Sequence, residues 1–158
     1  EEIEGLIGGT AAPMLVTRDE SIEDPIAFAM ETHLEDFLIE NWARTDLGRT
    51  FDINEEEGEL VGRQYQTDTG PMDILAISKD KRTLLVVELK KGRASDAVVG
   101  QLLRYMGYVK DELLEEDQMV KGIIIALTDD QRLRRAISLL QGTVDFYRYE
   151  VNFDLIKT

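Results

Sequence analysis

The sequence of 158 residues contains no cysteine and a single histidine, His33. The lack of cysteine excludes disulfides, iron–sulfur clusters, thiolate zinc sites and cysteine nucleophiles. One histidine cannot provide a zinc or copper site that is built from several imidazoles. If the protein uses a metal ion, carboxylate and carbonyl oxygens must hold it, and these ligands favour Mg²⁺ or Mn²⁺.

Long hydrophobic runs are also lacking. The longest, such as residues 123–127, have five apolar residues, far fewer than the roughly 20 that a membrane-spanning helix needs. The start of the chain has none of the features of a signal peptide. We therefore expect no membrane partner and a cytoplasmic location, at the nucleoid if the protein acts on DNA.

Positive charge is scarce. The sequence has 18 Lys and Arg and 32 Asp and Glu, which give a formal net charge of −14. Such a balance argues at first against a nucleic-acid partner. The deficit is local, however: residues 1–60 carry a net −14, residues 61–110 a net +4 and residues 111–158 a net −4. The middle of the chain is thus a basic segment between acidic flanks, an asymmetry that can mark a binding region.

The length is typical of one domain, and a chain of about 150 residues can bury enough surface to fold without disulfides or a structural metal. Residues 1–23 are expected to form a linker or flexible arm, because they contain Gly8-Gly9, Pro13 and several acids. The domain is expected at residues 24–158. Since the first residue is Glu1 and not Met, we also expect the chain to be a fragment that lacks an upstream part.

The hydrophobic spacing predicts alternating helices and strands. Leu84 to Val87 is continuously apolar, which is typical of a central strand covered on both faces. The order predicts a single α/β domain in which helices lie on both faces of a mixed α+β sheet. The predicted elements are a helix at 25–44 with Asp24 as N-cap, strands at 59–66, 72–78 and 83–90, a helix from Ser95 to Val109, a strand at 120–127, a helix at 129–140 and a strand at 143–151.

The triplet Glu88-Leu89-Lys90 ends the strand that is predicted to be most buried. Strand periodicity puts Glu88 and Lys90 on one face and Leu89 on the other. Charged side chains are rarely buried without partners, so this pair requires an explanation. One explanation is a salt bridge at a strand end, and the other is a chemical role.

Asp73 favours a chemical role. If the polar loop 79–82 joins two antiparallel strands, Asp73 lies opposite Glu88. Two carboxylates about 4 Å apart repel by about 4 kcal/mol at an effective dielectric near 20, so either one is protonated or a cation lies between them. A divalent cation there could polarise a phosphate and activate water, and Lys90 could orient that water or stabilise the transition state.

Asp73, followed fifteen residues later by Glu88-Leu89-Lys90, resembles the signature of the PD-(D/E)XK nucleases. More narrowly, the run from Gly62-Arg63-Gln64-Tyr65 to Asp73, together with Gln101-x-x-Arg104-Tyr105, resembles the NucS-type DNA endonucleases. The resemblance covers about residues 25–150 and implies a restriction-endonuclease-like αβββαβ core. One departure is that Met72 separates Pro71 from Asp73, whereas the family motif begins with Pro-Asp.

The resemblance implies a catalytic centre on the second and third strands. Asp73 and Glu88 would be metal ligands, with the backbone carbonyl of Leu89 beside them. Lys90 would be the catalytic lysine. The implied cofactor is Mg²⁺ or Mn²⁺.

Two helices would complete this centre according to the same resemblance. Glu35 matches an acidic residue on the first helix and would help to hold the metal or its water; alternatively it is an ordinary charge at the edge of the apolar stripe. Gln101 and Tyr105 share one helix face and would approach the site or the DNA backbone. Alternatively, both serve only to pack that helix against the sheet.

Basic residues near the predicted site are candidates for phosphate contacts, which position a nucleic acid without reading its sequence. Each could instead be a solvated surface charge. The candidates for DNA binding are Arg63, Lys91, Arg93 and Arg104, together with Tyr105.

We therefore predict a metal-dependent DNA endonuclease that hydrolyses phosphodiester bonds in branched, single-stranded or mismatched DNA. The alternative is a catalytically inactive module with the same fold that binds nucleic acid or protein, which the acidic residues 1–60 would suit. The resemblance to NucS-type enzymes also implies a homodimer and an upstream DNA-binding domain that this chain lacks.

Overall fold

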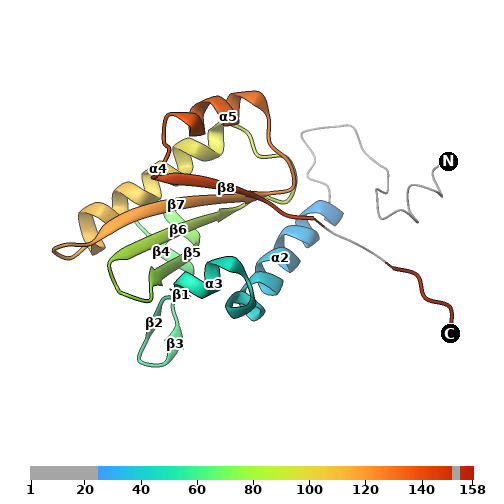
Figure 1. Cartoon of the computed structure of the whole chain (residues 1–158), viewed down its shortest axis with the longest axis horizontal. Coiled ribbons are helices and arrows are strands. Elements are labelled where there is room, and N and C mark those ends of the chain that lie inside the picture. Colours follow the sequence, from blue (N-terminus) through green and yellow to red (C-terminus); the bar gives the residue numbers. More distant parts are fainter. Residues whose placement is uncertain (1–24, 151–153) are drawn as a thin grey trace.

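A six-stranded mixed sheet forms the centre of the molecule (Figure 1). The structure is a computed structural model that describes residues 25–150 and 154–158, with side chains from residue 33 onward. The strand order is β1-β5-β6-β7-β8, with β4 also paired to β5. β1, β4 and β6 run antiparallel to β5, whereas β7 and β8 continue the sheet in parallel with β6. The strands are β1 (Phe51–Ile53), β2 (Glu55–Glu56), β3 (Glu59–Leu60), β4 (Arg63–Thr67), β5 (Gly70–Ser78), β6 (Thr83–Leu89), β7 (Met119–Ala126) and β8 (Val144–Arg148).

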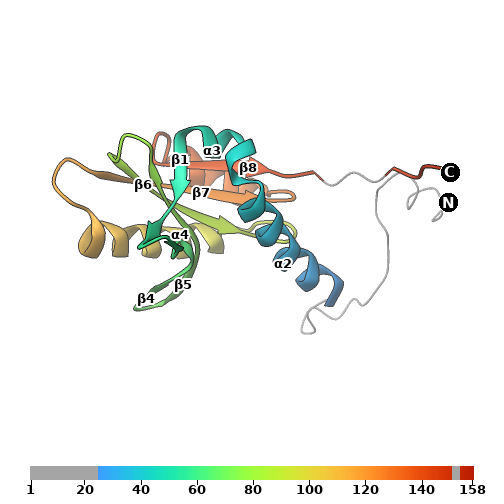
Figure 2. The ribbon, with the colours of Figure 1, turned by 90° about the horizontal axis from the view of Figure 1, so that it is seen from below.

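Helices cover both faces of this sheet (Figures 1 and 2). On one face, Leu38 and Trp42 share a buried cluster with Val87 of β6. On the other face, Leu102 and Leu133 share a second cluster with Val86. The predicted α+β fold, a mixed sheet between two helical layers, is therefore confirmed. The helices are α2 (Pro25–Glu40), η1 (Trp42–Arg44), α3 (Asp46–Thr50), α4 (Ala97–Tyr108), the π-helical η2 (Val109–Leu113) and α5 (Gln131–Ser138).

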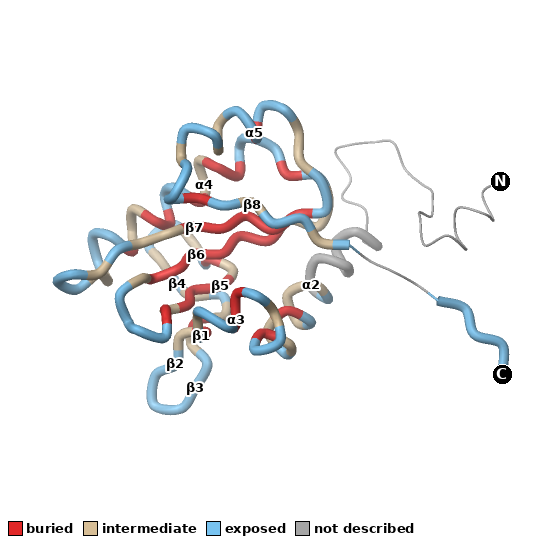
Figure 3. Tube along the Cα trace, viewed as in Figure 1, coloured by how far each residue is buried: buried red, intermediate tan, exposed pale blue. Residues whose placement is uncertain are grey.

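β6 is the buried central strand that the apolar run predicted. It has β5 on one edge and β7 on the other, and residues 84–89 are all buried (Figure 3). Val87 and Leu89 face the layer of α2, and Val86 faces the layer of α4. Alternation along the strand therefore turns Glu88 toward the α4 side.

The first predicted helix is shorter than expected. α2 ends at Glu40 rather than at residue 44, and the short turn η1 leads into a separate helix, α3. Thr45 causes the break, because its hydroxyl accepts a hydrogen bond from the Gly48 N–H (3.1 Å) and caps α3. The Trp42 indole N–H donates to the carbonyl of Phe51 (2.8 Å) and fixes this connection to β1.

The strand predicted at residues 59–66 is two strands. Among the described residues, β3 pairs with its hairpin partner β2 alone, and the chain then turns before β4 joins the main sheet. Gly62 lies at this turn, where a Cβ atom would come within 2.2 Å of the Leu75 carbonyl oxygen. Only a glycine fits that close approach of the two backbones. The short strands β1 and β2 were not predicted.

The remaining elements match the prediction except at their ends. α4 begins at Ala97 with Asp96 as its N-cap residue, not Ser95. α5 begins at Gln131 because the Asp130 carboxylate accepts a hydrogen bond from the Leu133 N–H (2.8 Å). β8 spans Val144–Arg148 and ends before residues 149 and 150 of the predicted strand 143–151, whose last residue lies outside the described part of the chain.

Two further findings concern expectations about the whole chain. The expected arm at residues 1–23 and the expected N-cap Asp24 lie outside the described residues. Across the described part of the chain, we find no helix with both the length and the apolar character that a membrane span requires.

Candidate active site

Asp73 and Glu88 lie side by side on β5 and β6. The register of the two strands pairs Ile74 with Val87, and the next position brings Asp73 beside Glu88. The backbone N–H of Asp73 lies 3.3 Å from Oε1 of Glu88. The hairpin count from loop 79–82 thus predicted this neighbourhood correctly.

The backbone of the Glu-Leu-Lys triplet fixes the Asp73 carboxylate. The N–H of Leu89 donates to Asp73 Oδ2 at 2.7 Å, so one oxygen of the carboxylate is held by the neighbouring strand. Asp73 itself is half-buried, while Glu88 is only 2% exposed. Two acidic side chains therefore meet at the edge of the core, largely out of bulk water.

Burial raises the pKa of Asp73 above its ordinary value. The hydrogen bonds from Leu89 and Gln64 oppose this effect, the nearby charge of Glu35 adds to it, and the ammonium of Lys90 opposes it. Burial disfavours the charged form of a carboxyl group, and a neighbouring negative charge does the same. The site therefore favours positive charge near Asp73.

Lys90 follows at the end of β6, where its N–H donates to the carbonyl of Ile125 in β7 (2.8 Å). Its ammonium nitrogen lies 3.5 Å from Oε1 of Gln101 on α4, a long hydrogen bond. The Gln101 amide nitrogen in turn lies 3.5 Å from the Tyr105 hydroxyl. The structure thus brings Lys90, Gln101 and Tyr105 together, as the sequence predicted.

Tyr105 belongs to the core more than to the surface. Its side chain is 5% exposed and lies in the buried cluster on the α4 side of the sheet. That leaves little of the ring to meet a DNA backbone. The hydroxyl is instead placed to orient Gln101, one helical turn before it.

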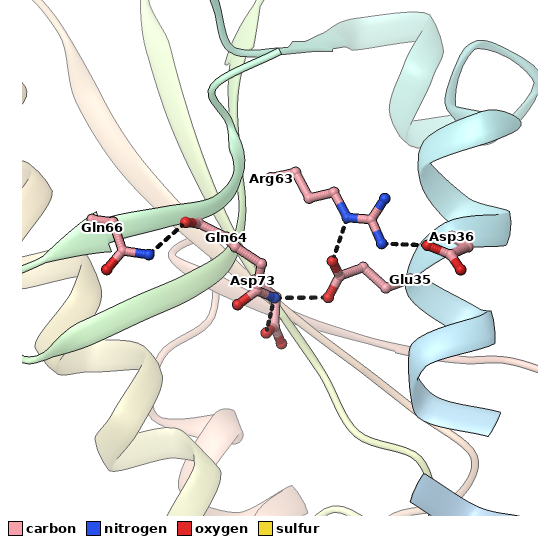
Figure 4. Close-up of polar contacts among 6 residues, drawn as sticks. All are labelled: Glu35, Asp36, Arg63, Gln64, Gln66 and Asp73. Carbon is pink, nitrogen blue, oxygen red and sulfur yellow. Dashed lines mark hydrogen bonds and ion pairs between the residues drawn. The ribbon is translucent and has the colours of Figure 1, made fainter. Parts of the chain in front are cut away.

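Glu35 reaches the same site from α2 (Figure 4). Its Oε1 accepts a hydrogen bond from Nε of Arg63 (2.6 Å), and its Oε2 accepts one from the amide of Gln64 (2.8 Å). The same Gln64 amide nitrogen lies 3.2 Å from Asp73 Oδ1. Glu35 is therefore joined to Asp73 through one amide group, and the Glu35 side chain is 14% exposed.

Arg63, a candidate for DNA binding, contacts two acids of α2. Its guanidinium bonds to Glu35 and also forms a close ion pair with Asp36 (Figure 4). The hydrogen bonds to Asp36 and then Glu35 raise the pKa of Arg63 above its already high ordinary value. In this arrangement Arg63 ties α2 to β4, which the sequence analysis did not predict.

The other basic candidates lie farther out. Arg93 and Arg104 are exposed, and Lys91 is half-buried. Arg104 borders a shallow hollow of about 290 Å³ between α4 and the turn before β5, and Asp68 and Asp111 also line that hollow. Arg63 contacts the acids of α2, so its surroundings differ from those of Arg104.

Gln64 is the residue of this centre that sequence reasoning missed. It was assigned no role, yet it contacts both Glu35 and Asp73. The signal in the sequence was its place in the run from Gly62 to Asp73 that resembles the NucS-type endonucleases, but strand alternation put it on the face opposite to Arg63.

The acidic residues fit a hard divalent cation by their chemistry. In the part of the chain that the structure describes, no three Asp, Glu or His side chains group closely enough to hold a metal ion by themselves. Asp73 and Glu88 nevertheless supply two adjacent carboxylates. Mg²⁺ in proteins is commonly held by one or two carboxylates, together with waters and substrate phosphates. The donor set therefore suits such an ion.

Comparison with known proteins identifies the family. Residues 30–148 match the model of the endonuclease NucS C-terminal domain. The chain belongs to this family. The resemblance to NucS-type endonucleases seen in the sequence is therefore confirmed, and with it the restriction-endonuclease-like fold.

The NucS relatives share part of their length with this chain. Endonuclease NucS of Methanocaldococcus jannaschii is 37% identical over 78 residues, which are 49% of this chain and 28% of that protein. Endonuclease NucS of Corynebacterium glutamicum strain R is 34% identical over 103 residues, or 64% of this chain and 38% of that protein. The chain thus spans well under half the length of these relatives.

Solved structures show the same fold. A repair endonuclease from Pyrococcus abyssi has a TM-score of 0.58 and 22% identity, over 83% of this chain and 49% of that chain. A complex of EndoMS with double-stranded DNA has a TM-score of 0.59 and 21% identity, over 85% of this chain and 49% of that chain. At this level of identity, the likeness concerns the fold.

Proposed function

We propose that this chain is the catalytic part of a metal-dependent DNA endonuclease that hydrolyses phosphodiester bonds. The observation that carries the proposal is the adjacency of Asp73 and Glu88, with Lys90 following on the same strand end. Membership of the NucS C-terminal domain family supports it.

Asp73 and Glu88 would hold Mg²⁺ or Mn²⁺, with the Leu89 carbonyl as a further ligand. The Leu89 N–H keeps Asp73 Oδ2 in place, so Asp73 needs little rearrangement to act as a ligand. When bound, a divalent cation supplies Lewis-acid polarisation of a phosphate. Glu35 stands next to this pair through Gln64 and would orient a water molecule or complete the ligand set.

Lys90 would act on the attacking water and on the charge that develops on the phosphate. Its long contact to Gln101, which Tyr105 supports, directs the ammonium group toward the face of β6 that carries Glu88. A preorganised cation of this kind stabilises a transition state without having to be reoriented during the reaction. Gln101 is therefore a positioning residue for Lys90 in this proposal.

The proposed substrate is branched, single-stranded or mismatched DNA. The similarity in fold to the EndoMS complex with double-stranded DNA supports a DNA partner. Arg93 and Arg104 are exposed and, with Lys91, would contact phosphates. Arg63 could do so only after leaving Glu35 and Asp36.

The test is cleavage of labelled single-stranded, branched and mismatched DNA in the presence of Mn²⁺. We expect wild type to cut at least one of these and Lys90→Ala to cut it roughly 10²–10³ times more slowly, as is usual for loss of a group that stabilises the transition state. Lys79→Ala is the matched control, because Lys79 lies in the turn at the opposite end of β5 and β6, where it pairs with Asp52.

Two results would contradict the proposal. One is a wild-type protein that cuts none of these DNAs, and the other is a Lys90→Ala variant that cuts as fast as wild type. Calorimetric titration with Mn²⁺ adds an independent measurement. We expect binding in wild type and its loss when Asp73 and Glu88 are both replaced by their amides, whereas an inactive binding module predicts no binding that depends on these two residues.

A further inference from the structure

Gln64 combines a rare backbone conformation with two acidic neighbours. Its φ angle is 51°, in the left-handed region that residues other than glycine seldom adopt. Its amide nitrogen lies 2.8 Å from Glu35 Oε2 and 3.2 Å from Asp73 Oδ1 (Figure 4). Unfavourable backbone conformations of this kind tend to occur at functional sites.

The left-handed conformation explains how two consecutive residues reach one carboxylate. In a regular strand, Arg63 and Gln64 would point to opposite faces of the sheet. Here both bond to Glu35, Arg63 through Oε1 and Gln64 through Oε2. The pairing of β4 with β5 passes from Arg63–Ile74 to Tyr65–Met72 across this residue. Gln64 therefore lies opposite Asp73, and the departure from strand geometry lets its amide reach Glu35 as well.

An amide is well suited to a place between two carboxylates. Its nitrogen carries two N–H donors and no charge, so it can donate to Glu35 and Asp73 at once. The two acids otherwise repel each other, and Glu35 raises the pKa of Asp73. A lysine in the same place would compete with a bound cation, and an acid would add to the repulsion.

We propose that Gln64 is a positioning residue that sets Glu35 relative to Asp73 and so prepares the acidic centre for a divalent cation. The inference rests on the proposed function, because the cation is the one that Asp73 and Glu88 would hold. Gln64 itself is not a ligand in this arrangement. Residues that hold metal ligands in place commonly change metal affinity or activity by 10–100-fold when they are removed.

Two substitutions, made in the full chain, distinguish the effect of the Gln64 backbone conformation from the effect of its amide group. Gln64→Gly removes the amide and also relieves the left-handed conformation, which glycine adopts freely. Gln64→Met removes the amide, keeps the length of the side chain and leaves the backbone conformation unfavourable. We expect Gln64→Gly to melt at a higher temperature than wild type and Gln64→Met not to do so.

Both variants are expected to bind Mn²⁺ at least about 10-fold more weakly than wild type in calorimetric titration. In DNA cleavage at saturating Mn²⁺, both should show a lower kcat with an unchanged KM for DNA. A purely structural role predicts instead that metal affinity follows thermal stability, so that only Gln64→Met is impaired. Gln141→Met is the matched control, because Gln141 is an exposed glutamine in the turn before β8, outside the acidic centre.

Unchanged Mn²⁺ affinity in both variants would overturn the inference. A raised KM for DNA with an unchanged kcat would also overturn it, because Gln64 would then be a DNA contact. These results differ from failure of the proposed function. If wild type binds Mn²⁺ but cuts no DNA, the proposed function fails while the comparison of metal affinities still decides the role of Gln64.

Discussion

Asp73 is subject to opposing electrostatic effects, and their balance can be measured. Burial raises its pKa most strongly, and hydrogen bonds from Leu89 and Gln64 act against that effect. A carboxyl group whose pKa rises on folding lowers the free energy of unfolding as the pH increases through the interval between the unfolded and folded pKa values. Ionised Asp73 therefore destabilises the metal-free protein at neutral pH.

We expect the Tm of Asp73→Asn minus that of wild type, measured in the presence of EDTA, to be larger at pH 7.5 than at low pH. The difference should narrow as the pH falls toward the ordinary aspartate value of 3.8, because wild type then becomes neutral at this position as well. Each kcal/mol of difference in the free energy of unfolding corresponds to a difference in Tm of about 2–4 °C for a chain of this size. Melting curves of both proteins at several pH values measure this difference.

Asp145→Asn serves as the control, since Asp145 is exposed on β8 and surface substitutions usually change stability by less than about 0.5 kcal/mol. A difference between Asp73→Asn and wild type that stays constant or grows as the pH falls would contradict this account of Asp73.

At the scale of single residues, the sequence predicted which two acidic residues are neighbours but not the other contacts around them. The pairing of Asp73 with Glu88 follows from the length of loop 79–82, because a hairpin loop fixes the register of its strands. The role of Gln64 could not be predicted, since it depends on a φ of 51° that no local pattern signals. The ion pairs of Arg63 with Glu35 and Asp36 could not be predicted either, because they depend on how α2 packs against β4, two elements that lie far apart in the sequence.

At the scale of elements, the turn at Gly62 controls where β4 begins. The N–H of Gly62 donates to the Asn54 carbonyl (2.9 Å), and its own carbonyl accepts from the Leu75 N–H (2.7 Å). A Cβ atom at this position would lie 2.2 Å from the Leu75 carbonyl oxygen. Because a backbone atom cannot give way cheaply, a larger residue must shift β4 relative to β5, and Arg63 and Gln64 with it.

We expect Gly62→Ala to lower the free energy of unfolding by about 1–3 kcal/mol, the usual cost of overpacking, and to weaken Mn²⁺ binding. Gly107→Ala is the matched substitution within helix α4, where a Cβ atom would meet nothing within 4 Å. It should stabilise the protein by about 0.5–1 kcal/mol, because alanine is the better helix former. Urea unfolding of both variants tests this pair, and a stable Gly62→Ala variant with normal metal binding would refute the role of the turn.

The elements that the sequence predicted are those with enough residues to show a periodic spacing of apolar residues. β5, β6, β7 and the three longer helices were all expected from apolar spacing. β1 and β2 have three and two residues, too few for any pattern to appear. β1 also depends on a distant partner, since Phe51 pairs with Ser78, whereas β2 pairs with the adjacent β3.

At the scale of the whole molecule, metal binding should be coupled to folding. A ligand that binds only the native state stabilises it by about 2.7 kcal/mol when its concentration is 100 times its Kd. For a chain of this size that corresponds to a rise in Tm of roughly 5–10 °C. We expect Mn²⁺ to produce such a rise in wild type, measured by thermal unfolding.

The matched control is the variant in which Asp73 and Glu88 are replaced by Asn and Gln, which should melt at the same temperature with and without Mn²⁺. An equal Mn²⁺ effect in this variant would place the ion elsewhere on the acidic surface, whose net charge of −14 could attract cations without a specific site.

The contacts of α2 with β4 also bear on when during synthesis the centre can form. Glu35 and Arg63 are 28 residues apart in the chain, and the Lys90 contact to Gln101 is made later still. Ribosomes add about 5–20 residues per second, and contacts between distant residues form only after the intervening chain has been closed into a loop. No nascent chain that ends before Gln101 holds the complete arrangement, so the proposed cutting activity would arise only once most of the domain has been translated and folded.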